Sequence, residues 1–242
     1  MAIRTGDELA KMAVYAATKC KTLYVHGCFG APMTEANKAY YLTNTDYNRQ
    51  PERQAMIRAA SPDTFGFDCV CLIKGILWGW RGNAALPYGG AAYRSNGVPD
   101  LGSNQIITVC RDVSSDFGSP GRLSVGELLW LPGHVGIALG DGLAVECTPD
   151  WRNCVQITSV NCARAGYSRR NWVKHGKLPW ITYAERSASS VNLLPIAREV
   201  IAGQWGNGSE RKERLAEAGH NPDAVQRAVN HLLRRESKKG RR

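Results

Sequence analysis

The order of apolar and polar residues predicts two helices in the first third of the chain. Residues 7–19, DELAKMAVYAATK, have apolar side chains three or four positions apart, at Leu9, Met12, Ala13 and Ala16. Asp7 is placed to cap that helix. Residues 65–80, FGFDCVCLIKGILWGW, are almost continuously apolar and indicate a buried helix. Residues 35–54 are polar and aromatic without a clear period, so we expect a long surface insertion there.

A period of two, typical of strands, follows a loop-rich region. Residues 81–120 are rich in Gly, Asn, Ser and Pro and predict loops with only short structure. In residues 127–148, ELLWLPGHVGIALGDGLAVECT, apolar side chains alternate with other residues, and Gly140-Asp141-Gly142 indicates a hairpin turn. The segments CVQITSV (154–160) and KLPWITYAE (177–185) predict further strands.

The chain changes character near residue 184. Residues 184–191, AERSASSV, are small and polar and predict a linker. Residues 192–233 contain three helical segments, separated by GQWGNGS and AGHNPD. Residues 234–242, RRESKKGRR, have six basic side chains and one acidic, so they carry +5 of the net charge of +10. We therefore expect a domain over 1–183, a linker over 184–191, a helical unit over 192–233 and a basic tail over 234–242.

Composition narrows the class of protein. With 242 residues, 43% hydrophobic and 21% charged, the chain is typical of a soluble globular protein, and it has no apolar run of membrane-spanning length. Charged residues interrupt the first 19 positions, where a signal peptide needs an apolar core, so we expect synthesis in a cytoplasm. The eight cysteines then predict reduced thiols. Cys147, Cys154 and Cys162 lack the C-x-x-C pairs of a structural zinc site, so we expect no metal. We also expect no cofactor.

The charge of +10 predicts an anionic partner such as a nucleic acid, a membrane surface or a bacterial wall. The basic tail is either a solubilising segment or an attachment to an anionic polymer. No nucleic-acid-binding motif accompanies it, so we expect no nucleic-acid partner.

Two cysteines one residue apart, Cys69 and Cys71, begin the predicted helix at 65–80. A helix turns about 100° per residue, so these side chains point in nearly opposite directions and only one can face a cleft. Asp68 can cap the helix, which places Cys69 in the first turn, where free N–H groups and the helix dipole favour a thiolate. We therefore expect Cys69 to be a nucleophile and Cys71 to be a core residue.

A thiol nucleophile needs a base, and the base needs an acceptor to orient it. His134 is the polar member of an otherwise apolar predicted strand. A three-residue hairpin loop at 140–142 would pair Gly136 with Glu146, which places His134 and Glu146 on one face as diagonal neighbours. A two-residue loop would put them on opposite faces, and His134 could then be a structural histidine.

Three motifs together resemble the NlpC family of papain-like cysteine peptidases. They are LYVHGCFGAP (23–32), FDCVCL (67–72) and GELLWLPGHVGIALGDG (126–142), in the order and spacing of that family. The resemblance implies an α+β fold of NlpC/CHAP type, in which an N-terminal nucleophile helix packs on an antiparallel sheet. It implies Cys69 as nucleophile, His134 as base and Glu146 as the third polar residue, and Tyr24 as a possible aid to the oxyanion.

The motifs depart from the family pattern at two places. Val70-Cys71 stands where Ser-Gly usually follows the nucleophile, and His26-Gly27-Cys28 stands where Trp-Gly-Gly is usual. His26 and Cys28 could form a second reactive pair. An inactive papain-like domain on a wall-binding protein is therefore an alternative.

Residues 196–233 resemble the short cell-wall-binding repeat of some phage lysozymes and other lysins, which forms a three-helix bundle. We expect Trp205, Asn207, Arg211 and Arg214 to contact wall ligands, because Trp stacks on sugar faces and Arg pairs with carboxylates. Trp205 could instead anchor the core of the bundle. The residues that we expect in that core are Ile196, Val200, Leu215, Val225, Val229 and Leu232.

The combined expectation is a monomeric peptidoglycan hydrolase resembling a phage endolysin, made in the host cytoplasm and released to act on the wall. The expected bond is the γ-D-glutamyl bond to the diamino acid, with the bond between muramic acid and L-alanine as the alternative.

Overall fold

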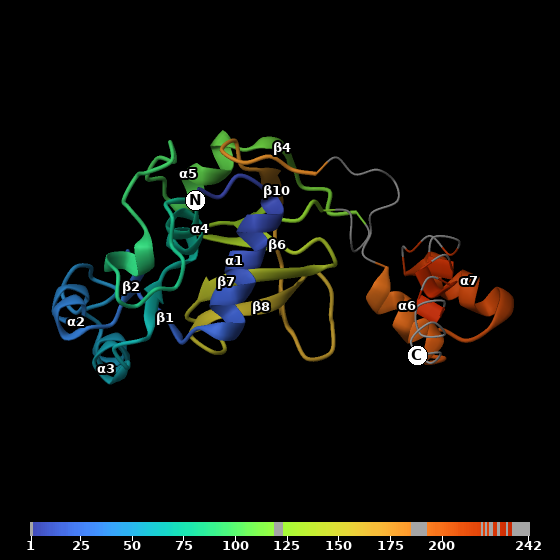
Figure 1. Ribbon diagram of the computed structural model, residues 1–242, viewed down its shortest axis with the longest axis horizontal. Helices are drawn as coiled ribbons and strands as arrows, with labels where there is room; N and C mark the ends of the chain where they lie inside the picture. The colour runs from blue at the N-terminus through green and yellow to red at the C-terminus, as the bar shows by residue number, and fades with distance from the viewer. Residues whose placement is uncertain are drawn as a thin grey trace, which may run out of the picture. The chain divides into compact units, whose positions relative to one another are not determined.

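A computed structural model of the chain describes residues 2–118, 123–184, 193–218, 220, 222, 225–226, 228–230 and 232–233. Internal contacts divide the chain into an N-terminal unit, Met1–Phe117 with Leu123–Ala184, and a C-terminal unit, Gly118–Arg122 with Glu185–Arg242. Each unit is described by itself (Figure 1). The basic tail, and the predicted linker beyond Ala184, lie outside the described residues.

The first helix, α1 (Gly6–Lys19), has the predicted extent but a different cap. The Thr5 hydroxyl accepts the Glu8 N–H at 3.2 Å, and the Glu8 carboxylate accepts the Thr5 N–H at 3.2 Å. This reciprocal capping box satisfies two N–H groups at once, so the expectation that Asp7 caps the helix is wrong. Asp7 lies in the first turn, where its negative charge faces the positive end of the helix dipole.

The predicted insertion is helical, and part of it is buried. It contains α2 (Glu35–Tyr41) and α3 (Pro51–Ala59). Tyr41 and Ile57 are 2% and 0% exposed, and they complete a small apolar cluster with four other residues, Val25, Cys28, Ala31 and Met33. The two helices therefore have a core of their own, although their sequence has no clear period.

The predicted helix over 65–80 is wrong in its first part. Residues Phe65–Phe67 form strand β3, and helix α4 runs from Cys69 to Leu77. Strand β3 lies in the middle of a three-stranded sheet, parallel to β1 (Thr22–Tyr24) and antiparallel to β2 (Phe29–Pro32). A central strand and a buried helix are both continuously apolar, so the pattern alone does not separate them. The consequence is that α4 begins at the cysteine itself.

A seven-stranded sheet forms most of the remaining N-terminal unit, in the order β4-β10-β5-β6-β7-β8-β9. All neighbouring strands are antiparallel except β8 and β9. The strands are β4 (Arg111–Ser114), β5 (Leu128–Leu131), β6 (His134–Ala138), β7 (Leu143–Thr148), β8 (Cys154–Val160), β9 (Ser168–Arg170) and β10 (Lys174–Lys177). Helices α1 and α4 pack against each other and against β6 and β7 (Figure 1).

Two other predictions have opposite outcomes. The described part of the predicted loop region, residues 81–118, is mainly loops, as expected, interrupted by η1 (Pro87–Gly90), α5 (Ser103–Ile106), η2 (Ile107–Val109) and strand β4. The expected strand over 177–185 is wrong, because only Lys177 belongs to β10. Leu178 and Ile181 are buried in the main core from a loop, so their apolar character reflects packing and not strand pairing.

The hairpin between β6 and β7 has the three-residue loop on which the predicted site depends. Ile137 pairs with Val145 and Ala138 with Ala144, and the Leu139 N–H donates to the Leu143 carbonyl at 2.9 Å. The predicted register is therefore confirmed.

The C-terminal unit contains α6 (Leu194–Ile201) and α7 (Gly208–Glu217), and its described residues between 222 and 233 are mostly helical. All six predicted core residues take part in its apolar cluster: Val200, Leu215, Val225 and Val229 are buried, and Ile196 and Leu232 pack against them. The three-helix bundle itself stays a prediction.

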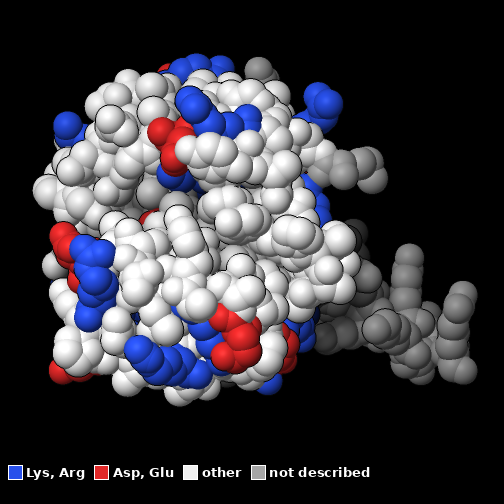
Figure 2. Space-filling model, turned by 90° about the vertical axis from the view of Figure 1, so that its left-hand side faces the viewer, with Lys and Arg blue, Asp and Glu red and all other residues white. Residues whose placement is uncertain are grey.

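Across the described residues, no helix has the length and apolar character needed to cross a membrane. The face shown in Figure 2 has basic side chains in small separate groups, several of them beside acidic ones, and much uncharged surface between. That face has no continuous basic patch.

Candidate active site

The start of α4 positions Cys69. Asp68 is the N-cap, as predicted: its carboxylate accepts the Cys71 N–H at 2.7 Å and, through its other oxygen, the Gly27 N–H at 2.8 Å. The cap therefore ties the beginning of the helix to the loop after β1. The Cys69 thiol lies 4.0 Å from the carbonyl oxygen of Gly133, the residue before the candidate base.

A tight turn between β5 and β6 positions His134. Leu131 pairs with His134, and Gly133 in the turn has φ of +81°, a conformation that favours glycine. The side-chain oxygen of Asn104 accepts the Gly133 N–H at 2.7 Å and the Trp130 indole N–H at 3.2 Å. Asn104 therefore holds the turn that sets the His134 side chain beside Cys69.

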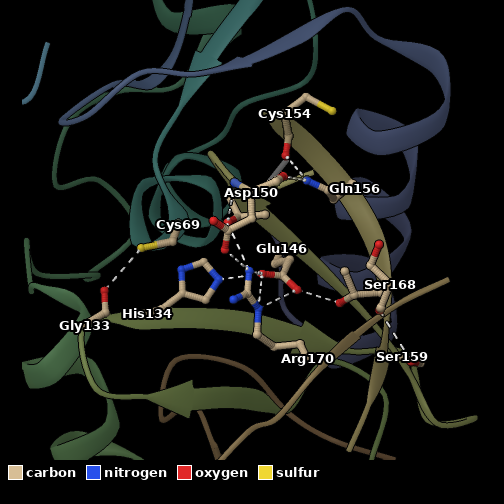
Figure 3. Close-up of polar contacts among 12 residues, drawn as sticks. Cys69, Gly133, His134, Glu146, Asp150, Cys154, Gln156, Ser159, Ser168 and Arg170 are labelled. Atoms are coloured by element: carbon tan, nitrogen blue, oxygen red, sulfur yellow. Dashed lines mark hydrogen bonds and ion pairs between the residues drawn. The ribbon is translucent and has the colours of Figure 1, made fainter. Parts of the chain in front are cut away.

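His134 lies between Cys69 and Glu146 (Figure 3). Its Nε2 is 2.6 Å from a Glu146 carboxylate oxygen, and its other ring nitrogen is on the side of Cys69. The imidazole is stacked on Trp172, with ring centroids 5.5 Å apart and planes within 11°. Gly136 makes room for this tryptophan, because a Cβ there would lie 2.8 Å from the Trp172 ring. The structure thus brings together the three residues that the sequence singled out.

Glu146 is completely buried on β7, with 0% of its surface exposed. Besides His134, its oxygens accept the Thr158 hydroxyl at 2.6 Å and the Arg170 Nε–H at 3.0 Å. Burial by itself would raise the pKa of Glu146, but the contacts with His134 and Arg170 hold it below its usual value. Glu146 is therefore a carboxylate that can orient the imidazole and stabilise its protonated form.

The expected thiolate at Cys69 is not the resting state of this site. The N–H groups of Val70 and Val135 lower the pKa of the Cys69 thiol, as expected at a helix start, but burial has the larger effect. Burial, together with the Asp68 carboxylate, raises that pKa to about 12. The thiol is therefore neutral at physiological pH, and it must lose its proton to a neighbouring base when it reacts. His134 is in the place to accept that proton.

Tyr24 lies at the edge of the site and is only 9% exposed. Burial, followed by the nearby Cys69 and Asp68, raises the pKa of Tyr24 far above its usual value, so the phenol keeps its proton and is an O–H donor. Tyr47 packs edge-on against its ring at 5.7 Å, and the Arg53 guanidinium lies over the ring at 5.6 Å. The helical insertion that contains Arg53 therefore supports this tyrosine.

The other two cysteines of the motifs, Cys71 and Cys28, are buried among core residues. Cys69 and Cys71 are 6% and 7% exposed, so exposure does not distinguish them, but burial raises the pKa of Cys71 well above its usual value among core residues. Cys28 is fully buried, and burial raises its pKa to about 11. His26, by contrast, is exposed and packs on Tyr47 at 5.8 Å. One side chain is therefore buried and the other exposed, so His26 and Cys28 do not form the reactive pair that the sequence allowed.

Sequence reasoning missed four residues of the site: Asn104, Thr158, Arg170 and Trp172. Each acts through a neighbour, and none stands in a recognisable motif. Arg170 and Trp172 lie in SRRNW, a stretch typical of a charged surface loop. A possible signal was the glycine two residues after His134, because a small residue in a buried strand indicates close approach of another group.

The predicted wall contacts lie on the C-terminal unit. Trp205 is partly buried against the core, and its indole N–H donates to Glu199 at 2.9 Å. Arg211 donates to Gln226 at 3.0 Å, and Arg214 pairs with Glu210 at 2.6 Å. Asn207, which is exposed, is the N-cap of α7. Trp205 therefore contributes to packing, Arg211 is half-buried, and Asn207 and Arg214 are exposed.

No group of three or more His, Cys, Asp or Glu side chains suited to a metal ion occurs within the described parts of the chain.

Comparison with known proteins identifies the C-terminal segment. Residues 195–233 match the CW_7 repeat family, and this segment is a cell-wall-binding repeat of that type. The chain is also 57% identical over 41 residues to a lysozyme of Streptococcus phage Cp-7. That similarity covers 17% of this chain and 12% of the phage lysozyme, so the two proteins share a segment and not their whole length. No solved structure matches the chain significantly.

Proposed function

We propose that the protein is a peptidoglycan hydrolase that cleaves an amide bond of the stem peptide by thiol catalysis. The observation that carries this proposal is the position of His134, which follows the Gly133 carbonyl beside the Cys69 thiol and contacts the buried Glu146, in a chain that also contains a CW_7 repeat. A wall-binding repeat brings an enzyme to an insoluble substrate, and a cysteine with a histidine and a carboxylate supplies amide hydrolysis. An NlpC-type fold for the N-terminal unit is part of the proposal.

The proposed reaction has two halves. The Cys69 sulfur attacks the amide carbonyl while its proton moves to His134, and the tetrahedral intermediate carries the negative charge on oxygen. The backbone N–H at the start of α4 and the Tyr24 hydroxyl would donate hydrogen bonds to that oxygen. His134 then gives its proton to the leaving amine, and a thioester remains on Cys69.

Water completes the cycle. His134, now neutral, takes a proton from a water molecule whose oxygen attacks the thioester carbonyl. The carbon–sulfur bond breaks, the thiol of Cys69 recovers its proton, and a free carboxylate is released. Glu146 remains ionised throughout and holds the imidazole in orientation. The resemblance to NlpC peptidases favours the γ-D-glutamyl bond to the diamino acid as the bond cleaved.

The test is mass spectrometry of the fragments released from purified Gram-positive peptidoglycan. We expect the wild-type protein to release new stem-peptide ends, and Cys69→Ala to lower the rate by about 10³-fold or more. Cys71→Ala is the matched control, because it removes a buried thiol two residues away and should leave the reaction in place. New γ-D-glutamyl ends identify an endopeptidase, whereas free muramic acid lactyl groups identify an amidase.

Wall binding is measured separately, by sedimentation of the protein with peptidoglycan. Cys69→Ala should still bind, because the repeat does not depend on the thiol. Binding without release of fragments by the wild type would contradict the hydrolase proposal and favour a catalytically inactive wall-binding protein.

A further inference from the structure

The carboxylate of Glu146 has an elaborate set of partners for a group that only orients a histidine. A buried carboxylate stays ionised only when its oxygens accept hydrogen bonds or face a positive charge. One Glu146 oxygen accepts from Thr158 at 2.6 Å and from Arg170 Nε at 3.3 Å. The other is 2.6 Å from His134 Nε2, 3.0 Å from Arg170 Nε and 2.9 Å from Arg170 Nη2. Arg170 thus brings a permanent positive charge to both oxygens.

Arg170 is itself held in place from three sides. Its Nη2 donates to the Asp150 carboxylate at 2.9 Å and to the Thr148 hydroxyl at 3.1 Å. Its guanidinium lies over the Trp151 ring at 4.5 Å from the centroid. Figure 3 shows the guanidinium beside Glu146, with dashed contacts to that carboxylate and to Asp150. A planar group with this many contacts has little freedom to turn, so it presents a fixed edge to Glu146.

We propose that Arg170 is a positioning residue of the reaction, which keeps the Glu146 carboxylate ionised and oriented toward His134. This inference rests on the proposed hydrolase function, because it assigns Arg170 a task in the same site. Arg170 has no contact with the Cys69 thiol among those described, and it acts on the chemistry through Glu146 alone.

The charge of Arg170 has a predictable effect on protons in the site. The ionisable groups that act on Cys69, Glu146 or Arg170 are Asp68 at the start of α4, Tyr24 of β1, Cys147 of β7, Asp150 after β7, and His134. Arg170 adds the permanent cation to this set. Loss of that cation makes it easier to add a proton to the Glu146 carboxylate, which then no longer holds the imidazole in orientation. The acid limb of the pH–rate profile therefore moves to higher pH.

The chain supplies a matched control on the same strand. Arg169 precedes Arg170 in β9, is exposed, and donates its Nε–H to Asn171 at 2.7 Å. Arg169→Met therefore removes the same charge, but from the neighbouring position and from the other face of the strand. We expect it to leave both the acid limb and the rate unchanged.

The experiment compares the pH–rate profiles of wild type, Arg170→Met, Arg170→Lys and Arg169→Met on purified peptidoglycan, with folding checked by circular dichroism. Arg170→Met should move the acid limb upward by about 1 to 3 pH units. Arg170→Lys keeps the charge but not the planar fork, so it should keep the wild-type acid limb and lower the rate at the optimum about tenfold. A merely structural arginine would lower the rate at every pH without moving the limb.

A second measurement does not depend on lytic activity. The rate at which iodoacetamide alkylates Cys69, followed by peptide mass spectrometry across pH, reports how readily the thiol loses its proton in the field of the neighbouring charges, Arg170 among them. Its midpoint should rise in Arg170→Met and stay in place in Arg170→Lys and Arg169→Met. If the wild type cleaves no peptidoglycan, the hydrolase proposal fails, while the alkylation profile still decides the effect of Arg170 on the site.

Three outcomes would overturn the proposal. The first is a folded Arg170→Met with the wild-type acid limb and the wild-type alkylation midpoint. The second is a limb in Arg170→Lys that moves as far as in Arg170→Met, which would exclude charge as the cause. The third is an equal movement in Arg169→Met. If Arg170→Met does not fold, Arg170→Lys decides, because a shifted limb in that variant contradicts the proposal and an unshifted one supports it.

Discussion

The N-terminal unit contains two histidine–glutamate pairs that are almost identical as pairs. The ring nitrogen and carboxylate are 2.6 Å apart in His134–Glu146 and 2.7 Å apart in His175–Glu127. Both histidine side chains are 13% exposed, and the glutamate side chains are 0% and 6% exposed. Distance and burial therefore do not distinguish the candidate catalytic pair from the other.

The two pairs differ in the group that faces the second ring nitrogen of each histidine. The Nε2 of His175 donates to the Asp116 carbonyl oxygen at 3.1 Å, so both of its nitrogens face acceptors. The hydrogen bond to Glu127 raises the pKa of His175 despite burial, so this pair favours the protonated imidazole. The second nitrogen of His134 instead lies toward a thiol. A histidine can act as a base only when one nitrogen is left for the reacting group.

The partners of the two carboxylates differ as well. Glu127 accepts the Ser124 N–H at 2.9 Å, which is a short-range contact near the start of β5. Glu146 has Arg170, from a strand 24 residues later in the chain. The comparison teaches that a buried His–Glu pair can have a purely structural role, and that the groups around the pair decide whether it can take part in catalysis.

The largest expected difference between the pairs is in activity. His134→Gln should lower the rate of fragment release from peptidoglycan by about 10²- to 10⁴-fold, because it removes the proton acceptor. His175→Gln should leave the rate close to that of wild type, when measured below the temperature at which the variant unfolds. Equal losses in the two variants would break the comparison, because they would show that a His–Glu pair of either kind acts only by supporting the fold.

The second difference is in the pH dependence of stability. The pKa of His175 is raised above 6.5, so its contribution is complete below pH 6.5 and is lost as pH rises through the folded value. Burial opposes ionisation of Glu127, but the contacts with His175 and Ser124 lower its pKa below 4.5, so its contribution is complete above pH 4.5 and is lost as pH falls through the folded value. The pair therefore stabilises the fold most between these two limits.

Urea unfolding at two pH values measures this effect. At pH near 5.5, His175→Gln should lower the free energy of unfolding by about 1.5 to 3 kcal/mol, the usual contribution of a hydrogen bond to a charged group. The loss should be smaller well above the folded pKa of His175. Glu127→Gln is expected to show the same dependence, and a loss that does not change with pH would contradict the raised pKa of His175.

The smallest expected difference comes from the aromatic ring beside each histidine. Trp172 stacks on His134, and Phe117 meets His175 edge-on at 5.2 Å. Trp172→Phe should lower the rate of fragment release about 2- to 10-fold, because a smaller ring holds the imidazole less firmly. The substitution removes a buried indole N–H without a partner but leaves a void beside Gly136, so the rates are compared below the temperature at which the variant unfolds. Phe117→Leu is the control, and an equal effect on the rate would contradict a role for stacking at His134.

Much of the local structure could be predicted from the order of the residues. Local patterns predicted the extent of α1, the strands of the β6–β7 hairpin and the apolar positions of the C-terminal repeat. Each of these features depends on residues that are close together in the sequence. The N-cap at Asp68 was predictable for the same reason. The errors came where long-range contacts decide, as in the apolar segment at Phe65, which is a strand because β1 and β2 flank it.

By itself, the sequence determined which residues could form a nucleophile, a base and an acceptor. It also indicated a hairpin that brings two of them together if its loop has three residues, since register follows from the length of a turn. Only the tertiary structure decided the surroundings of those residues. It brought Arg170 to Glu146 and Trp172 to His134, and it buried Cys69 so that its thiol is neutral at rest. Burial and long-range charge depend on segments far apart in the chain, and no local pattern records them.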